Sequence, residues 1–165
     1  MFTLLVVFAD DVYEVGRGLY GLLGAALGVG AILGTPIVAG WGSGLLRSRL
    51  IAGALVVYGA SLMAFALSPD YWWGVAALLV AGAGYLAVAS TLNTTLQLLV
   101  DEHMRGKVIA LYLMGLTFTV PVGNLIQGWM TEAIGPRVTV LIGGAAFLAV
   151  TGWLFTSRRL QLMDG

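Results

Sequence analysis

The 165-residue sequence contains no cysteine and only one histidine, His103. The absence of thiols excludes a disulfide framework, a thiolate nucleophile and a thiolate metal site. A metal cluster needs several ligands close together, and a single histidine in a charged turn is more simply interpreted as a surface residue. We therefore expect no catalytic residue, no bound metal and no cofactor.

Charge is scarce as well. Charged residues make up 10% of the chain and hydrophobic residues 59%, whereas a soluble domain carries about 25% charged residues. The 8 basic and 8 acidic side chains cancel, so the chain has no basic field to attract nucleic acid. A mean hydropathy of +0.96 exceeds what a soluble domain of this size can hide in its interior. These features predict an all-α integral membrane protein that is surrounded by lipid.

The apolar residues form five runs long enough to cross a hydrocarbon core of about 30 Å. They predict one membrane domain over residues 1–165, with spans at 19–41, 50–67, 73–100, 108–130 and 138–155. Residues 1–8 would make a helix of only about 12 Å, which we interpret as the end of a truncated spanning helix. Asp10, Asp11 and Glu14 would then form an acidic loop.

The basic residues predict the orientation of the spans. Six of them fall in alternate loops or the tail, and they are Arg47, Arg49, Arg105, Lys107, Arg158 and Arg159. Only Arg17 and Arg137 fall on the opposite side. Because short cytoplasmic loops carry an excess of basic residues, we expect the turns at 42–49 and 101–107 and the C-terminus in the cytoplasm. The protein would be a multi-pass protein of the cell (inner) membrane.

Glycine is frequent in the first full span. Two G-x-x-x-G spacings occur, one at Gly24 and Gly28 and the other at Gly30 and Gly34. This spacing lets the backbones of neighbouring helices approach closely, although glycine is also common in membrane helices in general. We predict that these four glycines pack against another helix.

Polar side chains follow one face of two spans. Asn93 and Gln97 lie on the third span, and Thr117, Asn124 and Gln127 lie on the fourth. An amide needs a hydrogen-bond partner at this depth, because lipid offers none. Two interpretations remain open: the five residues line a substrate cavity, or they bond across helices as structural contacts. Thr91 and Thr95 point away from this stripe and are expected to bond their own helix.

A short charged turn joins these two spans. It contains Asp101, Glu102, Arg105 and Lys107. The excess of basic residues in cytoplasmic loops is enough to explain Arg105 and Lys107. The alternative is that these two residues form a cytoplasmic gate by pairing with Asp101 or Glu102. No ionisable residue lies in the middle of any span, so the chain shows no proton-coupling carboxylate.

The residues around this turn resemble a known family. The run from Gln97 to Val108, followed by Leu111-Tyr112 and Pro121-Val122-Gly123-Asn124, is similar to the cytoplasmic turn and next helix in the C-terminal half of major facilitator superfamily transporters. The nearest likeness is to the branch containing the enterobactin exporter. Residues 9–13 and 21–26 look like the end of helix seven and the start of helix eight. The resemblance implies late helix seven through helix twelve of such a transporter, although Lys107 stands where the branch usually has arginine.

The resemblance implies alternating access, in which two six-helix halves rock about a central site. It points to export of small amphipathic molecules, drug-like or siderophore-like, by a half that is inactive without its N-terminal partner. DNA upstream of Met1 would then encode about six further helices. Two alternatives remain: a non-transporting structural or regulatory protein that pairs with another subunit, and a homodimer acting as a complete transporter.

Overall fold

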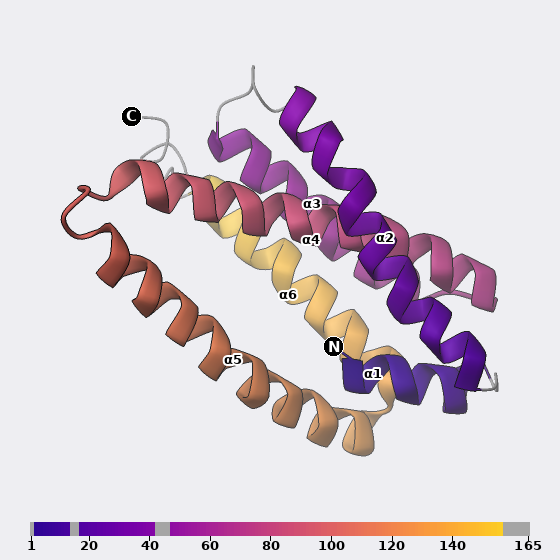
Figure 1. Ribbon diagram of the computed structural model, residues 1–165. Helices are drawn as coiled ribbons and strands as arrows, with labels where there is room; N and C mark the ends of the chain where they lie inside the picture. Colours follow the sequence, from indigo (N-terminus) through magenta and orange to yellow (C-terminus); the bar gives the residue numbers. More distant parts are fainter. Residues whose placement is uncertain (1, 14–16, 42–46, 157–165) are drawn as a thin grey trace.

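The computed structural model describes residues 2–13, 17–41 and 47–156, which are helical except at short connections (Figure 1). In chain order the helices are α1 (Phe2–Val7), the π-helix η1 (Phe8–Val12), α2 (Arg17–Trp41), α3 (Arg47–Ala66), α4 (Tyr71–Leu99), α5 (Arg105–Ile134) and α6 (Pro136–Thr156). The helices α2 to α6 are long and apolar enough to cross a membrane. The expected all-α architecture with five spans and a shorter first helix is confirmed. The residues at 42–46 and 157–165, expected in the cytoplasm, lie outside the described ranges.

The helices extend further than the hydropathy pattern predicts, and the turns are correspondingly short. Helix α5 starts inside the expected charged turn, at Arg105, and continues through Pro121 to Ile134. Gly135 alone separates α5 from α6, and its φ of 85° is a backbone angle that favours glycine. Helical hydrogen bonding satisfies the backbone polar groups within the membrane, and here it also continues beyond the apolar residues.

The prediction of an acidic loop after the first helix is wrong for Asp10 and Asp11. Both residues belong to η1, and the Tyr13 amide donates to the Phe8 carbonyl at 3.0 Å in the pattern of a π-helix. Buried Phe8 and Ala9 attach the segment to the core, which explains why it stays wound. Glu14 lies outside the described residues.

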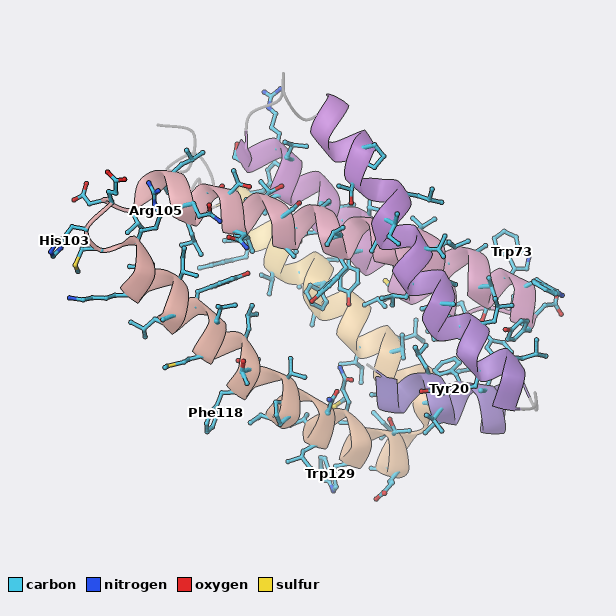
Figure 2. The ribbon with its side chains drawn as sticks, in the orientation of Figure 1. Tyr20, Trp73, His103, Arg105, Phe118 and Trp129 are labelled. Atoms are coloured by element: carbon cyan, nitrogen blue, oxygen red, sulfur yellow. The ribbon has the colours of Figure 1, made fainter. Side chains whose placement is uncertain are left out.

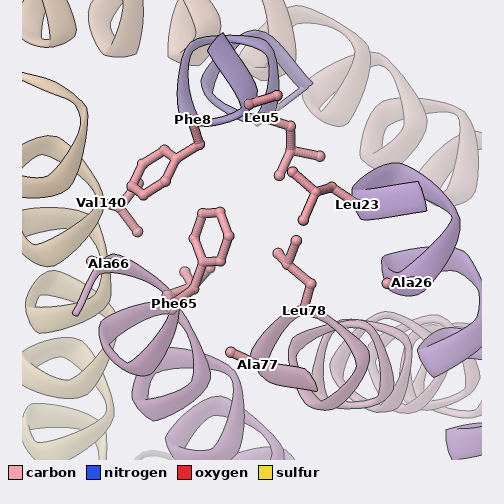
Figure 3. Close-up of a cluster of buried hydrophobic side chains, with 11 residues drawn as sticks. Leu5, Phe8, Leu23, Ala26, Phe65, Ala66, Ala77, Leu78 and Val140 are labelled. Carbon is pink, nitrogen blue, oxygen red and sulfur yellow. The ribbon is translucent and has the colours of Figure 1, made fainter. Parts of the chain in front are cut away.

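Four long helices pack side by side and form the body of the protein. Helix α4 packs against both α2 and α3, and α3 packs against α6 (Figure 1). Their apolar core includes Phe65 and Leu78, and Phe8 of the first segment lies against it with its ring centroid 4.5 Å from that of Phe65 (Figure 3). Helix α5 is different: it lies apart from this body along most of its length, and none of its residues is buried.

Glycines set the distance between α2 and α4. A Cβ atom added to Gly30 would collide with the carbonyl oxygen of Leu79, and one added to Gly82 would collide with the carbonyl oxygen of Leu27. Gly34 is equally enclosed, because its Cβ would lie 2.6 Å from that of Ala83. The two backbones therefore touch at positions where only glycine leaves room.

The other predicted packing pair occupies a different face of α2. Nothing lies within 4 Å of a Cβ added to Gly24 or Gly28. At 100° per residue, this pair is about 120° around the helix axis from Gly30 and Gly34. One helix face cannot carry both pairs, so α4 contacts the second pair and leaves the first open.

The two glycine pairs predict opposite effects of an added methyl group. We expect Gly30→Ala to lower the free energy of unfolding by about 1–3 kcal/mol, because it forces the α2 and α4 backbones apart. Gly28→Ala is the matched control and should leave stability unchanged or raise it by up to about 1 kcal/mol, because alanine is the better helix former. Unfolding in mixed detergent–SDS micelles measures both, and equal losses in the two variants would contradict the assignment.

Candidate functional site

The polar face of α4 lies near the end of the helix that leads into the charged turn. Asn93 and Gln97 are both exposed. The Gln97 Nε2 group donates a hydrogen bond to Asn93 Oδ1 at 2.7 Å, a contact between residues one helical turn apart. The two amides therefore satisfy each other in part and keep further donors and acceptors for another molecule.

The threonines of α4 behave as expected from the sequence. Thr91 Oγ1 donates to the Ala87 carbonyl and Thr95 Oγ1 to the Thr91 carbonyl, each at 2.7 Å. Thr95 is buried. Because these hydroxyls are used within their own helix, they leave Asn93 and Gln97 as the principal polar groups of this end of α4.

Helix α5 is apolar over much of its surface and carries its amides on one side only. Large apolar side chains on one face point away from the other helices, as Phe118 and Trp129 show in Figure 2. Phe118 is 80% exposed and Trp129 72%, and Leu111, Met114 and Leu125 share their face at helical spacing. This is the kind of surface that lipid hydrocarbon covers. Asn124 and Gln127 lie on the opposite side of the helix, among exposed apolar residues such as Leu116 and Val120.

The amides of α5 turn toward the rest of the protein. Asn124 and Gln127 are both half-buried, whereas Thr117, nearer the start of the helix, is exposed. The Gln127 Oε1 atom is enclosed and accepts no hydrogen bond from any described residue. Such an acceptor costs about 1–3 kcal/mol, so Gln127 is ready to accept a hydrogen bond from a donor.

The charged turn projects from one end of the protein, with His103 at its tip (Figure 2). The Asp101 carbonyl accepts hydrogen bonds from the amides of Met104 and Arg105, at 2.9 and 3.0 Å, and so starts α5. The side chains of Asp101, Glu102, Arg105 and Lys107 are all exposed. None of these four side chains forms an ion pair within the described ranges, and the proposed gate stays a prediction.

A second polar cluster lies where η1, the α3–α4 turn and the start of α6 meet. Tyr13 and Ser68 are hydrogen-bonded through their side chains, and Arg137 Nη2 donates to the Ser68 carbonyl at 3.4 Å. The sequence gives no signal for a contact among these residues, because hydroxyl and aromatic residues at helix ends are usual near a membrane surface. Only the three-dimensional structure brings them together.

No group of three or more His, Cys, Asp or Glu side chains within the described ranges is arranged to hold a metal ion. The candidate site therefore consists of the amides of α4 and α5 and the charged turn between these two helices. Five of the described helices are long and apolar enough to cross a membrane, and this arrangement is compatible with a multi-pass membrane transporter.

Comparison with known proteins agrees with this class. Residues 1–165 match the family described as transmembrane secretion effector, of the major facilitator type, and the chain belongs to this family. Membership points to a transporter rather than an enzyme. No curated protein and no solved structure matches the chain.

The enclosed Gln127 Oε1 atom, which accepts no hydrogen bond from the described residues, predicts how substitutions at this position change the stability of the protein. We expect Gln127→Met to raise the free energy of unfolding of the purified chain by about 1–3 kcal/mol, because an apolar side chain of similar length removes an unsatisfied polar atom. The matched control, Gln97→Met, removes a hydrogen bond that is formed and should lower stability by about 0.5–1.5 kcal/mol. A loss of stability in Gln127→Met, measured in mixed micelles, would show that its amide already has a partner.

Proposed function

We propose that this chain is the C-terminal half of a secondary exporter, late helix seven through helix twelve, closest to the enterobactin-exporter-like branch. Its substrates are small amphipathic molecules, drug-like or siderophore-like, moved by alternating access. The observation that carries the proposal is the inward-facing amide side of α5, whose Gln127 Oε1 has no donor among the described residues. Family membership over residues 1–165 supports the transport class.

The loose packing of α5 supports the need for a companion half. The body formed by α2, α3, α4 and α6 is packed by glycine contacts and a shared core, yet α5 buries no residue. In alternating access a central site lies between two bundles near the midplane. An N-terminal half, or less simply a second subunit, would cover the polar side of α5 and the exposed end of α4.

The chemistry of this face supports amphipathic substrates. Asn93, Gln97, Thr117, Asn124 and Gln127 offer amide and hydroxyl groups without charge. Such a face suits a molecule that combines an apolar body with a few polar groups. Because the middle of each span carries no carboxylate, a proton-coupling residue would belong to the companion half.

The distribution of basic residues supports insertion in the inner membrane with the charged turn and the C-terminus in the cytoplasm. In that orientation Asp101, Glu102, Arg105 and Lys107 lie at the cytoplasmic mouth of the transport path. Arg105 and Lys107 can then pair with the two carboxylates when the path closes on that side.

Transport in reconstituted vesicles tests the proposal. We expect the chain alone to move no amphipathic fluorescent dye against a gradient, and the chain joined to a six-helix N-terminal half to do so. In the joined protein, Asn124→Leu should lower the rate about fivefold, because loss of one hydrogen bond from this half-buried amide costs about 1 kcal/mol. The neighbouring Leu125→Ala, on the lipid-facing side, should change it less than twofold.

The outcomes separate the alternatives. Uphill movement of dye by the chain alone, with crosslinked dimers, would favour a homodimeric transporter. Stable pairing with the companion half and no dye movement under any imposed gradient would favour a structural or regulatory protein. Equal effects of Asn124→Leu and Leu125→Ala would remove the amide face of α5 from the transport path.

A further inference from the structure

The side chain of Tyr13 occupies a socket formed by the two ends of the α3–α4 connection. A Cβ atom added to Gly74 would collide with the Tyr13 hydroxyl and lie 3.0 Å from Cζ, so the absence of a side chain at position 74 makes room for the ring. The ring centroid lies 6.4 Å from that of Phe65 and 5.7 Å from that of Tyr71, both in edge-on arrangements. Such aromatic pairs are favourable beyond the area that they bury.

The hydrogen bonds in the socket have a defined direction. Ser68 Oγ donates its single proton to the Phe65 carbonyl at 2.7 Å. Its hydrogen bond with the Tyr13 hydroxyl must therefore use the tyrosine proton, with Ser68 Oγ as acceptor. Arg137 reaches the same serine from the start of α6 through the Ser68 carbonyl. One tyrosine thus connects η1 to α3, α4 and, through Ser68, α6.

The tyrosine is held in its donating form. Burial raises the pKa of the Tyr13 phenol above its ordinary value of 10.0, and smaller opposing effects come from the Ser68 hydrogen bond and the charge of Arg137. The phenol therefore keeps its proton at physiological pH. Tyr71 contributes separately, donating from its own hydroxyl to the Leu19 carbonyl at 2.7 Å and tying the start of α2 to the same end of the protein.

The segment that carries Tyr13 is wound as a π-helix. Helix η1 covers Phe8–Val12, and the Tyr13 amide closes it by bonding to the Phe8 carbonyl. A π-turn holds one residue more than an α-turn and is frequent at functional sites. Rewinding it to α would rotate the following residue by about 100°, the rotation of one residue in an α-helix. Tyr13 cannot stay in its socket after such a rotation.

We propose that η1 and Tyr13 form a two-state latch between the first helix and the rest of the protein. With Tyr13 in its socket, the segment is held in the π winding against the α3–α4 turn and the start of α6. With Tyr13 released, η1 rewinds to α and its end moves away from α6. The latch concerns contacts within this chain, so it stands whether or not the proposed export is correct.

The position of the latch gives it a mechanical role. Val12 and Val138 line one small pocket together with the α5–α6 turn around Gly135. Helix α5 joins α6 at this same turn. A change in the winding of η1 therefore acts directly on the end of α5 that contacts the body of the protein.

Distance measurements between spin labels test the latch in the full 165-residue chain, in lipid nanodiscs. The natural absence of cysteine allows labels to be placed at Val12→Cys and Val138→Cys alone. We expect one dominant short distance in this parent. Adding Tyr13→Phe keeps the ring and removes the hydrogen-bond donor. It should raise the population of a second, longer distance, relative to that of the short distance, about three- to tenfold, because one partly buried hydrogen bond is lost.

Two further variants make the test specific. Gly74→Ala leaves Tyr13 intact but fills its socket, and it should shift the distances in the same direction. Tyr20→Phe is the control, because the Tyr20 hydroxyl has no partner in the described part of the chain, and it should reproduce the parent distribution. An unchanged distribution in Tyr13→Phe, or an equal shift in Tyr20→Phe, would overturn the latch.

Discussion

The structure depends on direct backbone contact between α2 and α4. Lipid removes the hydrophobic drive that packs helices in water, so association must come from close van der Waals contact. Gly30 and Gly82 supply that contact from opposite sides of the interface, where any side chain would collide with a carbonyl oxygen. Gly59 and Gly144 repeat the arrangement between α3 and α6, with an added Cβ on Gly144 only 2.9 Å from the Gly59 carbonyl oxygen.

This packing divides the protein into a firm body and a loosely attached helix. The helices with mutual glycine contacts enclose the core, whereas glycines of α5 such as Gly115 and Gly123 have open space around them. Helix α5 is therefore held by few contacts with the four-helix body, and none of its residues is buried. A transporter that changes shape needs both kinds of element, one that moves as a unit and one that can shift against it.

The sequence predicted the elements well, because hydropathy alone defines helices in a membrane. The five spans and the self-bonded Thr91 and Thr95 are confirmed. The sequence could not decide which G-x-x-x-G pair meets a neighbour, since Gly24 and Gly30 differ only in the direction they face. The π-helical winding at Asp10 and Asp11 was also missed, because it arises from contacts with residues over fifty positions away, such as the Tyr13–Ser68 hydrogen bond. The roles assigned to Asn93, Gln97 and the charged turn stay predictions.

We propose that the amides of α4 and α5 face water and a partner bundle, while the opposite side of α5 faces lipid. Single cysteines in the joined protein test it most directly, with a membrane-impermeant thiol reagent applied to opened vesicles. The account predicts that cysteines at Asn93 and Asn124 react, that substrate slows both reactions, and that a cysteine at Phe118 stays unlabelled. Rapid labelling at Phe118 with none at Asn124 would contradict it.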